Sequence, residues 1–362
     1  MYRRAGLIAL SLAAAVLLTL AVVNALHRAR MPASPAIVAA AAGLRHGLAL
    51  WSDGTVTGWG YNKFGQVGDG TGINRSTPKR VRGLPPARQV AAGSDASFAL
   101  ARDGSVWAWG AGYGGERSPL AASRPLPVRL NGVTGAVYIA GAGAMGAAVL
   151  SGGSVKLWYV HNEGGPNNTA VRYLTLAGIR DVRAVAIDGT VVYALIKDGT
   201  VVAAETYNAP AGRFRTADEL RPAALPAAVG IEAIAVTEGT LFLLQEDGSV
   251  LRHDAANRTT VRVSGLKRIV AIAAARRQLL SLGYDGTVWQ WDYNAGPLAK
   301  PNRVKGLSHV IGIYGSATDL HFALKKGGKL FSWGIGMFGS LGQGSGSTSY
   351  QKEPVEVLPP LT

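Results

Sequence analysis

Alternating small and apolar positions run along most of this chain, and tight-turn signatures interrupt them at regular intervals. Each signature is a dipeptide ending in Gly, followed by a small or polar residue and an apolar one, as in Asp53-Gly54-Thr55-Val56. Successive copies lie 38 (247 to 285) to 50 (53 to 103) residues apart, a spacing typical of repeat architectures. The other copies are at 103–106, 152–155, 198–201, 247–250, 285–288 and 327–330.

Each repeat contains four strand-length runs. A run of small and apolar residues comes first, and a short apolar run then leads into the turn, which is typical of a β-hairpin. A third run carries Trp in most repeats, as at 56–59 and 106–109. The first runs are at 38–43, 89–93, 136–141, 182–187, 231–236, 269–274 and 310–315. Fourth runs marked by Pro or Val are at 78–84, 127–133, 171–179, 261–266, 301–307 and 354–358.

Four strands repeated seven times predict an all-β fold. A single four-stranded unit cannot bury both faces of its sheet, so the units are expected to stack in a ring. The sequence therefore predicts a seven-bladed β-propeller of four-stranded blades over residues 37–362.

The N-terminal segment has a different pattern. Residues 5–26 are rich in Leu, Ala and Val and contain no charged residue. A helix over these 22 positions (5 to 26) is about 33 Å long, enough to cross a bilayer. Residues 1–26 are predicted as one transmembrane or signal helix, followed by a linker at 27–36. Val23-Asn24-Ala25 offers a cleavage site, so an uncleaved signal anchor and a cleaved signal peptide both stay open.

Such a segment also predicts location. A long folded domain after it is translocated largely regardless of nearby charge. The propeller is therefore expected on the extracytoplasmic side, anchored in the inner (cell) membrane through residues 5–26. If the segment is cleaved, the protein is instead secreted or periplasmic.

Charge and cysteine content narrow the function classes. The net charge is +15, from 37 Lys and Arg against 22 Asp and Glu. A basic surface favours anionic partners, although it also aids solubility. The chain has no Cys, which excludes disulfides, thiolate metal sites and cysteine catalysis.

Three repeats share more than the turn. Residues 43–50 read Gly-Leu-Arg-His-Gly-Leu-Ala-Leu, and residues 59–68 read Trp-Gly-Tyr-Asn-Lys-Phe-Gly-Gln-Val-Gly. Residues 103–110 and 330–342 carry parts of the same pattern. These residues resemble the regulator of chromosome condensation repeat, and the resemblance covers about residues 37–362, most specifically in the first, second and last repeats.

The resemblance has implications for fold and function. It implies a seven-bladed ring, and it implies interaction rather than catalysis. In that family, strands from the two termini share a blade and close the ring; the sequence leaves open whether this chain closes in the same way. Some family members are guanine-nucleotide exchange factors for a nuclear small GTPase and bind chromatin. A secreted bacterial member inhibits β-lactamases through loops on one face. An export segment disfavours the nuclear role for this chain.

The sequence contains no specific motif for a catalytic, metal or cofactor site. Gly-x-Gly-x-x-Gly occurs at 110–115 and 334–339, but neither copy opens a helix in a βαβ unit. The six His have no metal-ligand spacing, and Asp before Gly has a local role in the turn. The sequence therefore predicts no catalytic residue, no metal site and no cofactor.

The loops after the Trp strands are expected to emerge on one face of the ring. Aromatic residues there are candidates for binding, because they dominate interface hot spots. The alternative is that the aromatic-Asn pair belongs to the repeat and packs inward. The candidates are Tyr61, Asn62, Phe64, Tyr113, Tyr159, Tyr207, Phe214, Tyr293 and Phe338.

Basic residues also gather along the chain. Candidates for a basic patch in and after the first long loop are Lys63, Arg75, Lys79, Arg80, Arg82 and Arg88. Further groups are Lys267, Arg268, Arg276 and Arg277, and Lys325, Lys326 and Lys329. Basic residues with aromatics can bind nucleic acid, but no known reading motif accompanies them and an envelope location disfavours that partner.

Three functions are weighed on this basis. The favoured hypothesis is a non-catalytic macromolecular interaction module on the extracytoplasmic side, with another protein as partner, or an anionic lipid or glycan. The second is an envelope enzyme, a lyase or hydrolase, with its site in the central channel. The third is guanine-nucleotide exchange or nucleic-acid binding, as in nuclear family members.

Overall fold

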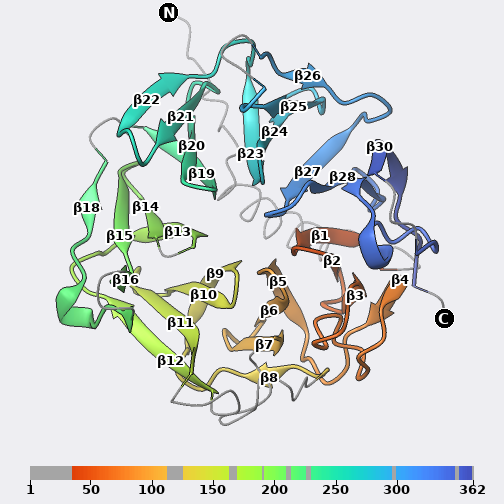
Figure 1. Cartoon of the computed structure of the whole chain (residues 1–362), viewed down its shortest axis with the longest axis horizontal. Helices are drawn as coiled ribbons and strands as arrows, with labels where there is room; N and C mark the ends of the chain where they lie inside the picture. The colour runs from red at the N-terminus through yellow and green to blue at the C-terminus, as the bar shows by residue number, and fades with distance from the viewer. Residues whose placement is uncertain are drawn as a thin grey trace, which may run out of the picture.

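The computed structural model describes residues 35–111, 125–162, 169–189, 191–208, 213–225, 230–295, 299–346 and 350–360. Their strands form seven four-stranded antiparallel sheets arranged in a ring (Figure 1). The predicted seven-bladed β-propeller is therefore confirmed. The predicted N-terminal helix lies outside the described residues. Within the described ranges, no helix is long and apolar enough to span a membrane.

The blades follow one another along the chain, and the first strand of each lies nearest the axis (Figure 1). Blade 1 contains β1 (Ile37–Ala42), β2 (His46–Trp51), β3 (Val56–Gly60) and β4 (Arg75–Arg80). Blade 2 contains β5 (Ala87–Ala92), β6 (Ala96–Ala101), β7 (Val106–Gly110) and β8 (Val128–Arg129). Blade 3 contains β9 (Ala136–Ala142), β10 (Met145–Leu150), β11 (Val155–Asn162) and β12 (Thr169–Leu176).

The second half of the ring follows the same order. Blade 4 contains β13 (Val182–Asp188), β14 (Val191–Ile196), β15 (Val201–Glu205) and β18 (Ala223–Ala224), with β16 (Tyr207–Asn208), β17 (Arg213–Phe214) and the 3-10 helix η1 (Ala217–Glu219) before β18. Blade 5 contains β19 (Ile231–Thr237), β20 (Thr240–Gln245), β21 (Val250–Asp254) and β22 (Thr259–Arg262). Blade 6 contains β23 (Ile269–Ala275), β24 (Gln278–Gly283), β25 (Val288–Asp292) and β26 (Asn302–Arg303). Blade 7 contains β27 (Val310–Gly315), β28 (Leu320–Lys325), β29 (Leu330–Ile335), the 3-10 helix η2 (Met337–Gly339) and β30 (Tyr350–Glu356).

The first strand of every blade, and the third strands β3 and β7, lie where the sequence predicts them, but the fourth strands differ. The run predicted at 301–307 yields only the two-residue β26, and the run at 78–84 is displaced to β4. The outermost strand has one unpaired edge, so it needs little apolar alternation. The Gly-Leu end of the run instead enters the connection to the next blade, where Leu266 and Leu307 are buried.

Ring closure also differs from that of the family that the sequence resembles. Each described blade is one continuous segment of chain, so the two ends of the ring do not share a blade. Blade 7 instead packs face to face on blade 1, with Phe322 edge-on to Trp59 at 5.4 Å between ring centroids. The Thr318 hydroxyl donates to the Leu44 carbonyl at 2.7 Å, and the Gly344 N–H donates to the Ser76 carbonyl at 2.8 Å. The sequence left the closure of this ring open, and in the described residues it is made by blade 7 packing on blade 1 and not by a shared blade.

Trp side chains of the third strands join a blade to the one before it. Trp59 is fully buried and lies over Gly47, its cross-strand neighbour on β2, because a Cβ at position 47 would overlap the indole. Its ring N–H donates to the Ser340 carbonyl of blade 7 at 2.8 Å. Trp109 of blade 2 donates in the same way to the Gln66 carbonyl of blade 1 at 2.9 Å. Hydrophobic clusters of described residues fill all seven seams between neighbouring blades.

Two fully buried histidines occupy different seams. His46 faces blade 2, where its Nε2 and the Ser97 hydroxyl lie 2.9 Å apart in a hydrogen bond. His321 packs on Trp333 toward blade 6, with ring centroids 5.3 Å apart, and its nitrogens have no hydrogen-bond partner among the described residues. Burial lowers the pKa of His321 to about 3, and burial together with Arg45 lowers that of His46 to about 3. Both rings are therefore neutral near pH 7.

The contact between Trp59 and Gly47 yields a stability prediction. Gly47→Ala is expected to lower the free energy of unfolding by about 1–3 kcal/mol, because the added methyl overpacks the seam against the indole. Gly152→Ala is the matched control, since a Cβ there meets open space and the expected change is within about 0.5 kcal/mol. Urea denaturation of both variants measures the difference. Equal stabilities would show that this contact does not hold the seam.

The buried histidines predict a pH dependence. Their pKa in the folded state lies below the ordinary 6.5, so their contribution to stability is complete above pH 6.5 and is lost as pH falls. Each contributes a slope of about 1 kcal/mol per pH unit between about pH 6 and pH 4.5. His321→Leu removes one unpaired imidazole, so this variant is expected to be at least as stable as the natural protein at pH 7.5 and to have a shallower slope. An unchanged slope in denaturation curves measured across this range would contradict the assignment.

Candidate functional site

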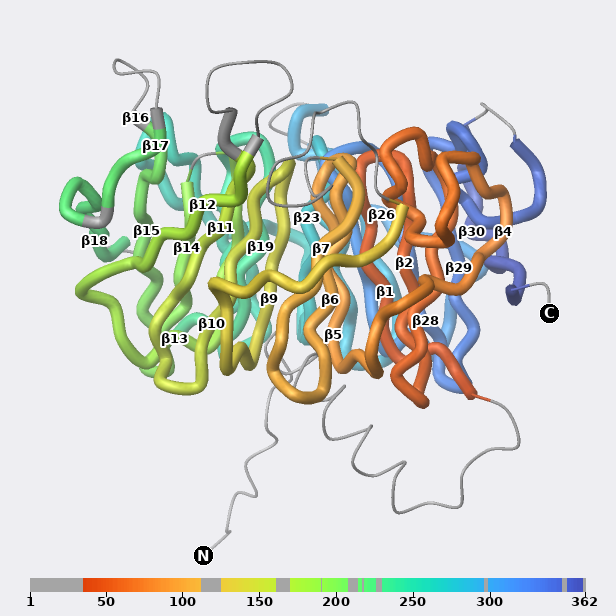
Figure 2. The backbone as a smooth tube through the Cα atoms, turned by 90° about the horizontal axis from the view of Figure 1, so that it is seen from below, coloured from red at the N-terminus to blue at the C-terminus, as the bar shows by residue number. Residues whose placement is uncertain are grey.

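The loops and turns divide between two faces of the ring. The register pairs His46 at the start of β2 with Gly60 at the end of β3, so the first-to-second-strand loop and the long third-to-fourth-strand loop share one face. We call this the loop face. The opposite turn face carries the Gly-ended hairpin turns, where Gly54 has a φ of 93°, and the connections to the next blade. Figure 2 shows the two faces as the upper and lower edges of the ring.

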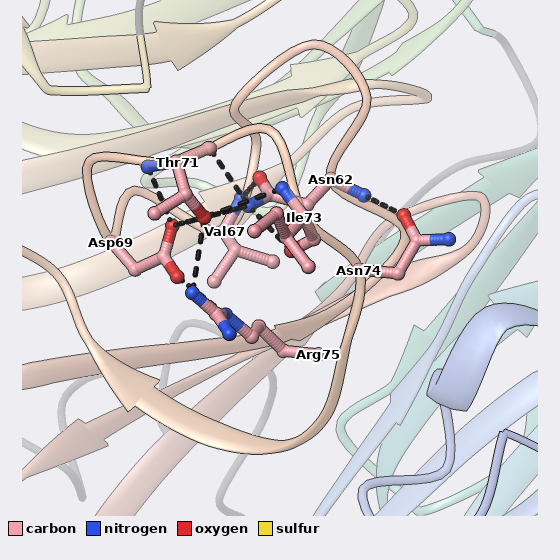
Figure 3. Close-up of polar contacts among 7 residues, drawn as sticks. All are labelled: Asn62, Val67, Asp69, Thr71, Ile73, Asn74 and Arg75. Carbon is pink, nitrogen blue, oxygen red and sulfur yellow. Dashed lines mark hydrogen bonds and ion pairs between the residues drawn. The ribbon is translucent and has the colours of Figure 1, made fainter.

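Asn62 is fully buried and holds the long loop of blade 1 (Figure 3). Its side-chain N–H groups donate to the carbonyls of Thr71 (2.9 Å) and Ile73 (3.0 Å), and to the Asp69 carboxylate (3.1 Å). Its side-chain oxygen accepts the N–H of Val67 at 2.9 Å. The amide is therefore satisfied within the loop, which agrees with the alternative that this residue of the repeat packs inward.

Three predicted candidates come together where blade 7 meets blade 1. Tyr61 lies 4.9 Å from Phe338 and 6.2 Å from Phe64 between ring centroids. The Arg45 guanidinium lies 4.2 Å above the Tyr61 ring and 5.7 Å from the Phe338 ring, and it pairs with Asp95 at 3.4 Å. We call Arg45, Tyr61, Phe64 and Phe338 the seam cluster.

The edge of the seam cluster is open to solvent. Met337 is 36% exposed and Lys63 is exposed, whereas the three aromatic rings are half-buried. Phe338 has a φ of 57°, in the left-handed region that a bulky side chain rarely adopts. Backbone strain of this kind is concentrated at functional sites, so the conformation of Phe338 indicates a functional surface.

The other aromatic candidates lie elsewhere. Tyr159 stacks on Phe214 at 3.8 Å between centroids, and Tyr207 lies edge-on to Phe214 at 5.4 Å. This second group belongs to blades 3 and 4, across the ring from the seam cluster (Figure 1). Tyr293 is buried, donates its hydroxyl proton to the Arg276 carbonyl at 2.7 Å, and has its pKa raised to about 12 chiefly by burial. Tyr113 lies outside the described residues.

The six basic candidates do not form one patch. Arg75 pairs with the Asp69 carboxylate at 2.6 Å, and Arg88 on β5 lines the central channel and donates to the Ala136 carbonyl at 2.6 Å. The other four extend over different parts of the blade 1 segment, from Lys63 in the long loop through the half-buried Lys79 on β4 to the exposed Arg80 and Arg82.

The central channel is a cavity of about 300 Å³ lined by the innermost strands. Ala, Val and Ile make up most of its wall, and the polar side chains there include Gln89 and Tyr314. The described lining contains no His, Asp, Glu or Ser; its titratable side chains are Arg88, Tyr138 and Tyr314, and burial raises the pKa of both tyrosines to about 12. His46 and His321 lie in the seams instead, and within the described ranges no group of three potential ligands is placed to hold a metal ion.

Sequence reasoning missed two members of the site. Arg45 lies in the short first-to-second-strand loop, and Met337 is at the start of η2. Arg45 and Asp95 occupy equivalent positions in successive repeats, one position before His46 and Ala96. The opposite charges of Arg45 and Asp95 at equivalent repeat positions could have predicted an ion pair between blades 1 and 2.

Comparisons with known proteins agree with this architecture. Two family models, both described as the regulator of chromosome condensation (RCC1) repeat, match residues 53–100, and residues 37–66 and 87–116. The structure of yeast RCC1 (Prp20) bound to Kap60 aligns with a TM-score of 0.66 at 17% identity, covering 83% of each chain. Prp20p from Saccharomyces cerevisiae alone aligns with the same score and identity, covering 83% of this chain and 85% of that one. At this identity the likeness shows the fold.

Curated relatives match over shorter stretches. The human probable E3 ubiquitin-protein ligase HERC6 is 36% identical over 128 residues, which are 33% of this chain and 12% of that protein. The ultraviolet-B receptor UVR8 of Arabidopsis thaliana is 42% identical over 76 residues, 20% of this chain and 17% of that protein. The matched parts thus span less than a fifth of either relative. Residues 37–116 of this chain match regulator of chromosome condensation repeats, and they lie within a seven-bladed β-propeller.

Proposed function

We propose that this chain is a non-catalytic protein-binding propeller whose contact surface is the seam cluster on the loop face. The observation that carries the proposal is the convergence of Tyr61, Phe64 and Phe338 around Arg45, with Met337 and Lys63 at the solvent edge. Aromatic residues and Arg are the residue types that supply most binding energy at protein interfaces.

The chemistry of the cluster suits a protein partner. Half-buried aromatic rings offer a large apolar contact area, and the Arg45 guanidinium adds donors for carbonyl or carboxylate groups. Asp95 balances the charge of Arg45 at 3.4 Å, so the centre of the surface is close to neutral. Such a centre with a charged rim from Lys63 resembles the usual anatomy of a protein interface.

The cluster is also held in place before binding. The Asn62 amide network fixes the loop that carries Tyr61 and Phe64, and Trp59 joins this blade to the Ser340 carbonyl next to η2. A surface that is already ordered loses little conformational entropy on association. Because folding already orders these side chains, little further conformational entropy is lost when a partner binds to them.

The structural neighbours support this class of partner. One neighbour was solved as a complex of yeast RCC1 with Kap60, and the other was studied for its binding to Gsp1p and histones. Both structures are of yeast RCC1 (Prp20), a propeller of this fold that binds proteins. The partner of the present chain is inferred from its own surface and is not taken from theirs.

The proposal places the propeller on the extracytoplasmic side of a membrane. The support is the uncharged apolar segment at residues 5–26, which is long enough to span a bilayer and precedes the folded domain. Anchoring through this segment, or release after its cleavage, leaves the propeller on the same side.

Loss of a partner on mutation tests the binding proposal. Full-length protein is captured after crosslinking in the membranes of cells that contain it, and bound proteins are identified by mass spectrometry. Tyr61→Ser with Phe64→Ser is expected to reduce one abundant partner by about ten-fold or more, because two hot-spot side chains are removed. Tyr284→Ser is the matched control, since Tyr284 is 58% exposed on the opposite face. Equal recovery with the double variant, or no protein partner at all, would contradict the proposal.

A labelling experiment tests the location. The chain has no Cys, so Ser345→Cys in the exposed loop before β30 introduces a single thiol. A membrane-impermeant maleimide is expected to label this thiol in intact spheroplasts as completely as after lysis. Labelling only after lysis would place the propeller in the cytoplasm and would leave the seam-cluster proposal to be judged separately.

A further inference from the structure

Exposed basic residues gather on the turn face of blades 6 and 7, opposite the seam cluster. Lys267 and Arg268 lie in the connection before β23, and Lys305 lies in the connection before β27. Lys325 ends β28, and Lys326 lies in the turn that follows it. Of these five residues, Lys325 is half-buried and the other four are exposed. We call these five residues the turn-face basic patch.

Backbone contacts make the patch continuous. The Tyr284 N–H donates to the Arg268 carbonyl at 3.0 Å, and the Lys326 N–H donates to the His309 carbonyl at 2.9 Å. A Cβ at Gly286, in the turn after Tyr284, would touch the His309 backbone at 3.1 Å. The Lys325 ammonium reaches the Gly306 carbonyl at 3.3 Å. The two connections and two turns therefore form one surface.

The charge of this surface is not balanced as it is elsewhere on the turn face. In the turns of blades 2 and 4, Arg102 is followed by Asp103, and Lys197 is followed by Asp198. In blade 7 the turn reads Lys-Lys-Gly-Gly, so the usual Asp is absent. Blade 6 keeps its turn acid, Asp285, directly after Tyr284.

Neighbouring acids do not neutralise the patch. Asp247 in the next turn lies 3.8 Å from Arg262, and Glu356 pairs with Lys329 at 3.0 Å. In the described part of the chain, no ion pair engages Lys267, Lys305 or Lys326. These charges are free to meet an anionic surface.

An exposed aromatic ring accompanies the charges. Tyr284 is 58% exposed, and the Arg268 guanidinium lies 4.8 Å from its ring centroid. Tyr with adjacent basic side chains is the combination found at the headgroup level of membranes, where the ring enters the interface and the cations meet phosphate.

The chain enters the ring beside this patch. The Ser52 N–H donates to the Ala36 carbonyl at 2.9 Å, and a Cβ at Gly328, in the turn of blade 7, would contact Ala36. Residue 35 therefore begins the described chain on the turn face (Figure 2). Ten residues from 27 to 36 reach at most about 35 Å, so a bilayer that holds residues 5–26 lies within this distance of Ala36, which is next to the turn of blade 7.

We propose that the turn-face basic patch docks on the anionic headgroup surface of a lipid bilayer. Lys267, Arg268, Lys305 and Lys326 contact lipid phosphates, and Tyr284 enters the interface. Docking in this orientation directs the loop face, with the seam cluster, away from the membrane. The inference rests on the membrane location in the proposed function but not on the seam cluster or on a protein partner.

Lipid proximity tests the docking. Full-length Ser308→Cys carries a fluorophore in the exposed connection between Lys305 and His309, and Ser345→Cys carries the same fluorophore on the loop face as the matched control. Each is reconstituted in nanodiscs containing headgroup-nitroxide lipid, with either phosphatidylglycerol or only phosphatidylcholine. We expect strong quenching at position 308 with phosphatidylglycerol, little quenching with phosphatidylcholine, and little quenching at position 345 with either lipid.

Charge dependence completes the test. The triple variant Lys267→Gln, Arg268→Gln, Lys326→Gln is expected to reduce the ratio of docked to undocked protein by about a hundred-fold, since each basic residue contributes roughly five-fold at an anionic surface. For the natural sequence, raising salt to about 1 M shortens the Debye length to about 3 Å and is expected to release the quenching.

Three results would overturn the docking. They are equal quenching at position 308 with the two lipids, unchanged quenching in the triple variant, and release of the fluorophore from lipid by a short DNA duplex, which would make nucleic acid the preferred partner. The variant Tyr61→Ser with Phe64→Ser is expected to dock normally, and the triple variant is expected to keep its protein partner. Failure of one proposal is therefore distinguishable from failure of the other.

Discussion

In blades 1, 2 and 3, a Trp of the third strand lies over a residue with little or no side chain on the second strand, and it packs in the seam with the preceding blade. Trp59 covers Gly47 and donates its N–H to blade 7, so the same side chain fills a seam and links two blades. Because the contact closes the ring between blades 7 and 1, no shared blade is needed. It also places β3 and η2 side by side, which brings Tyr61 next to Phe338.

Much of the fold was predictable because local rules repeat. The hairpin turns need a Gly with positive φ, and the inner three strands need apolar positions on both faces, so each leaves a clear pattern. The outermost strand leaves little pattern, as the displacement of β4 and the shortness of β26 show. Ring closure was not predictable, because it depends on contacts such as Thr318 with Leu44 between the ends of the ring.

The candidate site was less predictable than the fold. The choice of aromatic residues as binding candidates included Tyr61, Phe64 and Phe338. It also included Tyr293, whose hydroxyl donates to the Arg276 carbonyl within the protein. Sequence position cannot tell a ring that packs inward from one that stays open, since both follow the same strand. The pairing of Arg45 with Asp95 across a seam becomes evident only when neighbouring blades are placed side by side.

The loop face presents aromatic side chains and the turn face presents exposed basic side chains. We propose a protein partner for the loop face and a membrane for the turn face. Hydrogen exchange of the full-length chain in its native membranes, compared with the detergent-purified chain, tests this division most directly. In the membranes, we expect slower exchange of loop-face amides at 61–74 and 335–342, and of turn-face amides at 265–268, 305–309 and 325–328. Protection spread evenly around the ring, or absent from both sets of amides, would contradict this division.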